Sequence, residues 1–190
     1  MQLEHIRIEK CGQRGVVGKY CTHFHLLGAC KTCRFKGNAI EYAHQRGTVV
    51  HGTHLVTVEE NVYNDVRGAN MYIEDGNELY NFFNYNVAVC PWALNDKIMH
   101  GCTVPGTDNG QADTSLNQAC LWSLSSTNHL IGNRCSNSFT GMLYESGAFE
   151  GRGRNGAVRG KVCTNYGKWG RVHGNTFHSH GRFGTYFLGD

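Results

Sequence analysis

Asn38-Ala-Ile-Glu-Tyr-Ala-His-Gln-Arg-Gly-Thr-Val-Val-His-Gly52 and Asn61-Val-Tyr-Asn-Asp-Val-Arg-Gly-Ala-Asn-Met-Tyr-Ile-Glu-Asp-Gly76 follow one pattern. Each segment opens with Asn, places an apolar residue two positions later, and closes with a short apolar strand and Gly. The same pattern opens at Asn133 and at Asn175. The first two copies start 23 residues apart, and the second and third start 72 apart, which is about three such periods.

A repeat in the low twenties with several short strands is typical of a solenoid. A leucine-rich repeat has this period too, but its Leu-x-x-Leu-x-Leu frame is absent here. We therefore predict an all-β fold, a right-handed single-stranded parallel β-helix with coils of about 22–26 residues. Stacked Asn side chains would form hydrogen-bonded ladders inside the turns. The strands are expected at residues 49–50, 55–58, 70–73 and 141–144.

Composition supports one β-rich domain over residues 1–190. Charged residues make up 17%, hydrophobic residues 40%, and there are 25 Gly but 2 Pro. A helical bundle would need more Ala, Leu, Glu and Lys, and a disordered chain would have fewer aromatic and β-branched residues. Both prolines lie in residues 91–117, where the repeat breaks, so we expect a projecting loop there and a second one at 147–160.

The net charge of +3 is too small to indicate nucleic acid, but it is compatible with an anionic polymer as partner. No apolar run approaches 18 residues, so no membrane span is expected. The N-terminus lacks the apolar region of a signal peptide. The chain starts in mid-pattern with Ile6-Arg7-Ile8, and we expect it to be part of a longer protein with other domains.

Nine cysteines cannot all pair within the chain. One interpretation is an extracellular protein with several disulfides; the other is a set of buried free thiols. Cys30 and Cys33 have the spacing of a zinc or redox pair, but a zinc ribbon needs a second such pair. A disulfide or a pair of turn thiols is therefore the favoured interpretation.

Histidines recur at the spacing of one coil. His23 and His25 are two residues apart, so on a β-strand they share a face while Phe24 points the opposite way. His51 follows His25 by 26 residues, and Asp75 follows His51 by 24. Equivalent positions of stacked coils lie about 4.8 Å apart, so His25, His51 and Asp75 are predicted to form a column on one face.

Charged residues surround this column in the sequence. Lys19 and Arg46 lie near enough in the repeat to meet an anionic substrate, and Glu74 precedes Asp75 directly. If the strand stayed regular, Glu74 and Asp75 would point to opposite faces, so they would form a poor general-acid pair.

Three hypotheses follow for the column. The imidazoles and a carboxylate, His23, His25 and Asp75 foremost, would bind a divalent metal. Alternatively, an imidazole acts as general base and a carboxylic acid as general acid on a sugar chain. In the third, the histidines stack as a polar ladder without chemistry. Elsewhere, His173, His178 and His180 are interpreted as turn residues, and residues 151–156 as a glycine-rich loop.

The three segments together resemble a known family. Gly18-Lys-Tyr-Cys-Thr-His-Phe-His25 is similar to the Gly-Arg-Tyr-Pro-x-His-Phe-His segment of cell-migration-inducing hyaluronidase, its transmembrane relative and the fibrocystin-like proteins, with Cys21 in place of Pro. His51-Gly-Thr53 and Ile73-Glu-Asp-Gly76 resemble that family's His-Gly-Thr and Leu-Glu-Asp-Gly segments. The resemblance is strongest over residues 1 to 92.

The resemblance implies a cell-surface or secreted β-helix, with hyaluronan depolymerisation in some members and no enzyme role in others. It implies His23, His25, Arg46, His51 and Asp75 as groove residues. The first hypothesis is thus a glycan depolymerase with His23, His25, His51 and Asp75 as catalytic residues and Arg46, Lys19 and Glu74 as substrate-binding residues. The others are a non-catalytic module that binds a carbohydrate or protein, and a structural solenoid segment.

Overall fold

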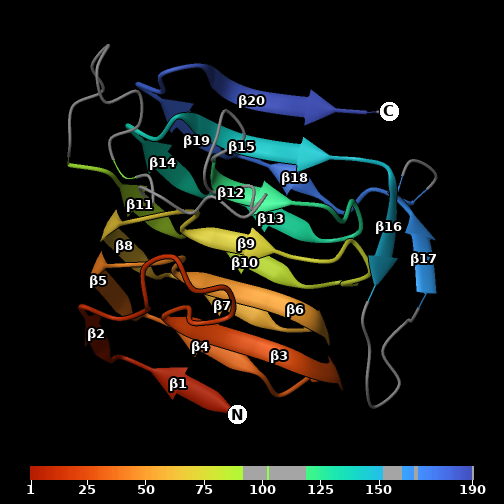
Figure 1. The fold of residues 1–190 in the computed structure, drawn as a ribbon, viewed down its shortest axis with the longest axis horizontal. Coiled ribbons are helices and arrows are strands. Elements are labelled where there is room, and N and C mark those ends of the chain that lie inside the picture. Colours follow the sequence, from red (N-terminus) through yellow and green to blue (C-terminus); the bar gives the residue numbers. More distant parts are fainter. Residues whose placement is uncertain (92–101, 103–118, 152–159, 165–166, 190) are drawn as a thin grey trace.

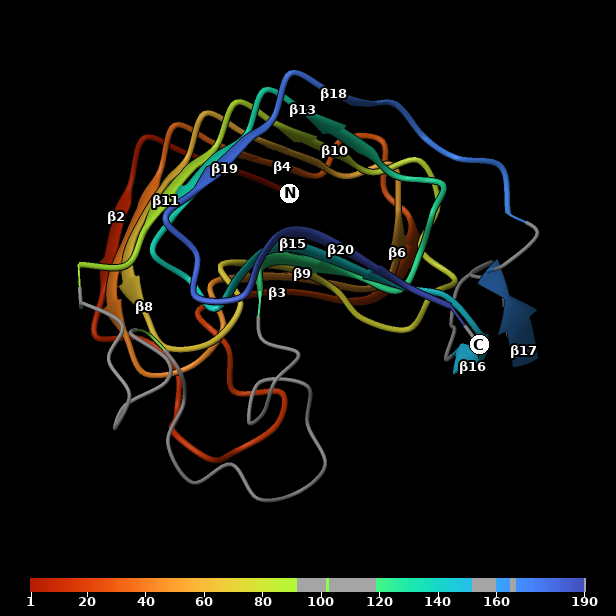
Figure 2. The same cartoon turned by 90° about the horizontal axis from the view of Figure 1, so that it is seen from above.

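The chain folds into a parallel β-helix, as the repeat predicts (Figure 1). The structure is a computed structural model that describes residues 1–91, 102, 119–151, 160–164 and 167–189. Within these residues, three parallel sheets of six strands run along the stack of coils, and each coil adds one strand to each sheet. Figure 2 looks along the stack and shows the sheets around a common interior. The described residues contain no helix with the length and hydropathy that a membrane crossing needs.

Each sheet collects every third strand of the chain, apart from one hairpin. Sheet A has the order β1 (Gln2–Glu4), β4 (Arg34–Lys36), β7 (Thr57–Glu59), β10 (Phe82–Asn84), β13 (His129–Ile131) and β18 (Val172–His173). Sheet B has β2 (Arg7–Glu9), β5 (Ala39–Ala43), β8 (Val62–Val66), β11 (Val87–Val89), β14 (Arg134–Ser136) and β19 (Thr176–His178). Sheet C has β3 (Thr22–Ala29), β6 (Thr48–His54), β9 (Met71–Ile73), β12 (Ala119–Ser123), β15 (Thr140–Glu145) and β20 (Phe183–Leu188). The hairpin pairs β16 (Ala148–Gly151) with β17 (Gly160–Cys163) in antiparallel fashion.

The predicted asparagine ladder runs through the corner between sheets A and B. Its members are Asn38, Asn61, Asn86, Asn133 and Asn175. From Asn61 onward, each Oδ1 accepts a hydrogen bond from the backbone N–H of the preceding ladder member, at 2.9–3.1 Å. The Oδ1 of Asn38 accepts one from the Ile6 N–H at 3.0 Å. A second ladder, Asn81 to Asn128, lies at another corner and was not predicted. The amides satisfy buried backbone groups that the turn leaves without strand partners.

The ladder corrects the expected spacing of the coils. Successive members are 23, 25, 47 and 42 residues apart. The 72 residues between Asn61 and Asn133 therefore contain one intermediate rung, Asn86, instead of the two that three equal periods would require. The 47-residue coil includes the loop expected at 91–117, of which residues 92–101 and 103–117 lie outside the described residues. The loop expected at 147–160 begins as β16, and residues 152–159 lie outside the described residues.

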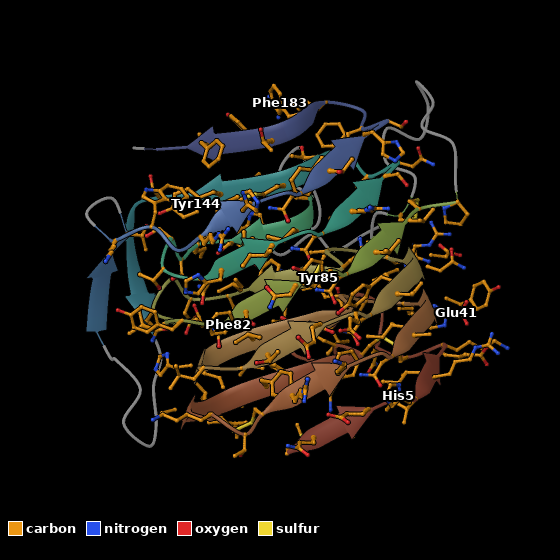
Figure 3. All side chains as sticks on the ribbon, turned by 180° about the vertical axis from the view of Figure 1, so that it is seen from behind. His5, Glu41, Phe82, Tyr85, Tyr144 and Phe183 are labelled. Carbon is orange, nitrogen blue, oxygen red and sulfur yellow. A yellow bond between two sulfur atoms is a disulfide. The ribbon has the colours of Figure 1, made fainter. Side chains whose placement is uncertain are left out.

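A left-handed residue precedes each ladder asparagine. This position is Gly37, Gly132 or Gly174 in three coils and Glu60 or Tyr85 in the other two, with φ between 56° and 66° in all five. A Cβ on Gly132 would lie 2.5 Å from the Tyr85 ring, which is labelled in Figure 3. Glycine is thus required where the corner residue of the preceding coil lies against the backbone.

Apolar columns fill the interior. Phe24, Val50 and Ile73 occupy equivalent positions of β3, β6 and β9, and each is at most 1% exposed. A second apolar cluster lies on the outer face of sheet C and includes Val49 and Tyr72. His23 pairs with Val49, and Val49 with Tyr72, so His23 begins the column that this outer cluster continues.

Four disulfides join eight of the nine cysteines. They are Cys11–Cys21, Cys30–Cys33, Cys90–Cys102 and Cys120–Cys135. The prediction of several disulfides is therefore confirmed over that of free thiols. Cys30 and Cys33 also form a disulfide, which is one of the two favoured interpretations of this pair. Cys21, which stands in place of a proline in the resembled motif, closes the loop that leads into β3.

Candidate functional site

The histidine–carboxylate cluster lies on the outer face of sheet C, across strands β3 and β6 and the end of β9, and consists of His23, His25, His51, Glu74 and Asp75. Phe24 is fully buried, so the alternation of β3 turns both of its histidines to the outer face, as predicted. His25 pairs with His51 in the parallel register. Their ring centroids are 4.9 Å apart, the separation of stacked strands.

Ring nitrogens converge within the cluster. His25 Nδ1 lies 3.2 Å from His23 Nε2 and 3.2 Å from His51 Nδ1. The other ring nitrogen of His51, Nε2, lies 2.9 Å from Asp75 Oδ2, so it donates a hydrogen bond to that carboxylate. A continuous polar chain therefore runs from the exposed His25 through the buried His51 to Asp75.

Both carboxylates reach the cluster, which corrects the expectation that Glu74 and Asp75 face opposite sides. Strand β9 ends at Ile73, and the backbone turns at Gly76 with φ 84°. Alternation does not apply beyond the end of the strand. Glu74 Oε2 lies 3.8 Å from His51 Nδ1 and 4.0 Å from His23 Nε2. By register, Glu74 rather than Asp75 follows His51 in the column, because Val50 pairs with Ile73.

The cluster shifts the pKa values of its histidines in opposite directions. Burial lowers the pKa of His23 to about 4, and the charges of His25 and His51 act in the same direction. Burial also opposes protonation of His51, but its hydrogen bond to Asp75 and the negative charge of Glu74 raise its pKa above the ordinary value. The hydrogen bond to Asp75 therefore favours protonation of His51, whereas His23 stays neutral near pH 7.

Glu78 holds the turn that carries the carboxylates, and the sequence did not single it out. Its Oε1 accepts hydrogen bonds from the backbone N–H groups of Gly52, at 2.9 Å, and Asp75, at 3.0 Å. The residue is fully buried, and this burial raises its pKa to about 7. The only sequence signal was a third carboxylate shortly after Glu74 and Asp75, in a segment without helical or strand periodicity.

Arg46 and Lys19, expected to bind substrate, lie in different environments. Arg46 is 1% exposed; its Nη1 donates a hydrogen bond to the Tyr20 hydroxyl at 3.0 Å, and its Cζ lies 3.5 Å from the centre of the Tyr72 ring. This burial favours a positioning role, because Tyr20 in turn contacts His23 at a ring separation of 4.9 Å. Lys19 is exposed and lies in the loop closed by the first disulfide.

Replacing Arg46 with lysine should therefore reduce stability. Lysine keeps the charge but cannot both lie flat on Tyr72 and donate to the Tyr20 hydroxyl. We expect the free energy of unfolding, measured by urea titration, to fall by about 1–2 kcal/mol. Arg14→Lys, a substitution at an exposed position, is the control and should change it little. Equal stabilities of the two variants would contradict the positioning role.

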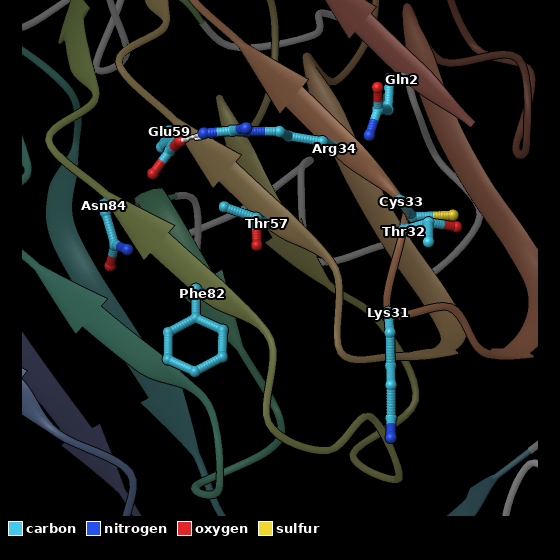
Figure 4. A pocket seen from close by; sticks show the side chains of 9 residues that line it. All are labelled: Gln2, Lys31, Thr32, Cys33, Arg34, Thr57, Glu59, Phe82 and Asn84. Atoms are coloured by element: carbon cyan, nitrogen blue, oxygen red, sulfur yellow. Dashed lines mark hydrogen bonds and ion pairs between the residues drawn. The ribbon is translucent and has the colours of Figure 1, made fainter.

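Among the described residues, His178 and His180 are not part of the cluster. The histidine-and-carboxylate groups with metal-binding geometry in this part of the chain involve only the five cluster residues. His178 is exposed on β19, and His180 Nδ1 contacts the Ser138 carbonyl at 3.2 Å. A depression of about 500 Å³ on sheet A is lined by Arg34 and Glu59, which form an ion pair (Figure 4). None of the site residues predicted from the sequence lines this depression.

Comparisons with known proteins identify relatives over most of the chain. A family model described as the CEMIP beta-helix matches residues 1–185. Fibrocystin-L of Homo sapiens is 37% identical over 89 residues, which cover 46% of this chain and 2% of that protein. Protein rliB of Dictyostelium discoideum is 28% identical over 147 residues, covering 75% of this chain and 13% of that protein. A G8 domain-containing protein of the same organism is 29% identical over 150 residues, which cover 75% of this chain and 10% of that protein. The chain thus spans a small part of each of these relatives.

Proposed function

Because this chain belongs to the CEMIP β-helix family, we propose that it is the module of a longer extracellular protein that binds and cleaves an anionic glycan. The cleavage site is the histidine–carboxylate cluster. Hyaluronan is the substrate to test first, since the sequence resembles cell-migration-inducing hyaluronidase in the segments that build the cluster. A cell-surface or secreted location is supported by the four disulfides, which persist in oxidising compartments.

The observation that carries this proposal is the chain of contacts from His25 through His51 to Asp75. Imidazoles and carboxylates are the groups that transfer protons at neutral pH, and a carboxylate behind an imidazole orients its ring and stabilises its charge. The exposed His25 is the member that a sugar chain would reach. A purely structural ladder has no need to place a buried imidazole between a carboxylate and an exposed imidazole.

Positive charge near β3 supports an anionic ligand. Arg14 and Lys19 are exposed on the loop closed by Cys11 and Cys21, which leads directly into the strand of His23 and His25. The chain as a whole carries a net charge of +3. Glu74 lies among the histidines, and its position suits a role in the cluster better than contact with a polyanion.

The test is incubation of the protein with high-molecular-weight hyaluronan, followed by size analysis of the polymer. We expect shortening by the wild type, at least about 100-fold slower cleavage by His25→Ala, and unchanged cleavage by His178→Ala, a control at another exposed histidine. Circular dichroism confirms that each variant folds. Ultraviolet absorbance of an unsaturated uronate in the products would separate elimination from hydrolysis.

Other results would favour the remaining hypotheses. Hyaluronan binding without shortening, lost in His25→Ala, would show a non-catalytic binding module on the same face of sheet C. Neither binding nor shortening by the folded protein would contradict the proposal and favour a structural solenoid segment.

A further inference from the structure

We propose that the histidine–carboxylate cluster is a divalent-metal centre. The ligands are His23 Nε2, His25 Nδ1 and His51 Nδ1, with Glu74 as the oxygen ligand. Asp75 does not bind the ion but orients His51. Metal binding goes beyond the proposed function, because it follows from the positions of the ring nitrogens and requires no glycan.

Two pairs of ligand nitrogens already have nearly the separation found in a tetrahedral site. Ligand atoms about 2.0–2.1 Å from a tetrahedral zinc ion lie about 3.3–3.4 Å from one another. His25 Nδ1 is 3.2 Å from both His23 Nε2 and His51 Nδ1. Glu74 Oε2 is 3.8 Å from His51 Nδ1 and 4.0 Å from His23 Nε2. Small side-chain rotations would bring these atoms around one ion.

Hydrogen bonds elsewhere on the rings leave the converging nitrogens available. His51 Nε2 donates its proton to Asp75 Oδ2, so in the neutral ring Nδ1 carries the lone pair. His23 also interacts with the backbone of Gly18, and its Nε2 faces His25. The Nδ1 lone pair of His51 faces His25 as well. A carboxylate or a backbone carbonyl behind the ring is the usual support of a metal-binding histidine.

The scaffold holds these ligands in place without the ion. His23 and His25 are fixed by the buried Phe24 between them, and His51, which is 3% exposed, by its pairing with His25. The register of β3 shifts after His25, which ends regular pairing at the cluster. Such irregularities often occur beside functional sites. Glu78 fixes the turn after β9 through two backbone N–H groups, so the carboxylates are held as well.

The donor set selects the class of ion. Three imidazoles and one carboxylate suit zinc and neighbouring transition-metal ions, whereas calcium and magnesium prefer sites made of oxygen ligands. The exposure of His25 leaves the ion accessible from solvent. A bound ion of this class would polarise a sugar oxygen or a water at the same place where the proposed function needs chemistry.

The test is titration of the whole 190-residue chain, first stripped with EDTA, with zinc chloride by calorimetry and with cobalt(II) by visible absorption. We expect one zinc per chain and cobalt absorption typical of tetrahedral coordination. His25→Ala, which removes a ligand, should weaken zinc binding at least about 100-fold, while Asp75→Asn should weaken it about 10–100-fold with the stoichiometry kept. His178→Ala should bind zinc like the wild type.

Three outcomes would overturn the metal centre: no zinc binding by the folded wild type, unchanged binding by His25→Ala, or loss of binding in His178→Ala. These results are distinguishable from failure of the proposed function. Zinc binding without shortening of hyaluronan keeps the metal centre and removes the cleavage. If the protein shortens hyaluronan but binds no zinc, and EDTA does not inhibit it, the cleavage is kept and the metal centre is removed.

Discussion

Replacing Asn86 with alanine should lower the free energy of unfolding by about 4 kcal/mol. Asn86 is fully buried, and its Oδ1 accepts hydrogen bonds from the backbone N–H and the side-chain Nδ2 of Asn61, at 3.0 and 2.9 Å. Its Nδ2 donates to the Val58 carbonyl at 3.0 Å. Alanine leaves these groups without that partner in the interior, where each unsatisfied group costs about 1–3 kcal/mol.

Urea unfolding of wild type and variant measures the effect, and Asn84→Ala is the matched control. Asn84 lies two residues earlier, on the partly exposed face of β10, so its removal should change stability by less than about 0.5 kcal/mol. Similar losses in the two variants would show that the ladder contributes nothing beyond an ordinary partly buried amide.

Replacing Glu78 with glutamine should make the protein more stable than the wild type at pH 8, but not at pH 4.5. Burial raises the pKa of Glu78 to about 7 from an ordinary 4.5. Because the folded state binds this proton more tightly than the unfolded state, its contribution to stability is present below about pH 4.5 and is lost as the pH rises through about 7. The loss amounts to about 3 kcal/mol. Glutamine has the shape of the protonated side chain and does not ionise.

The measurement compares urea unfolding of the wild type and Glu78→Gln at pH 4.5, 6 and 8, with EDTA present throughout. Titrating groups that do not interact with Glu78, such as His23, are common to both proteins and cancel in the difference between them. The negative charge of Glu78 also raises the pKa of His51, so the difference includes this smaller contribution. Glu4→Gln, a substitution on the exposed strand β1, is the control and should show no such trend. A difference between wild type and Glu78→Gln that stays constant with pH would contradict the raised pKa.

The parts of the fold that depend on stacking could be predicted from the sequence. The repeated Asn residues indicate the turns, and from them the ladder could be predicted. The alternation around Phe24 indicates the faces of the strand, and from it the shared face of His23 and His25 could be predicted. Asn86 was missed because its coil is lengthened to 47 residues, which hides the period. Its neighbour Tyr85 also occupies a left-handed position that is glycine in other coils.

The details of the site depend on the ends of strands, where alternation no longer applies. The sequence placed His25 and His51 in one column, and the register has them paired. It could not show that Glu74 and Asp75 turn toward the same cluster, because that follows from the end of β9 at Ile73. The burial of Arg46 likewise depends on Tyr20 and Tyr72, which approach it from different coils.

The asparagine ladder keeps successive coils in register even when the coils differ in length. Asn86 and Asn133 are 47 residues apart, yet Asn86 N–H reaches Asn133 Oδ1 at 3.1 Å, much as Asn38 reaches Asn61 across 23 residues. Lengthening a connection costs only a slowly growing closure entropy, and the next rung restores the register. We therefore expect the scaffold to accept a foreign peptide grafted between β11 and β12 without a change in the strands that carry the histidines.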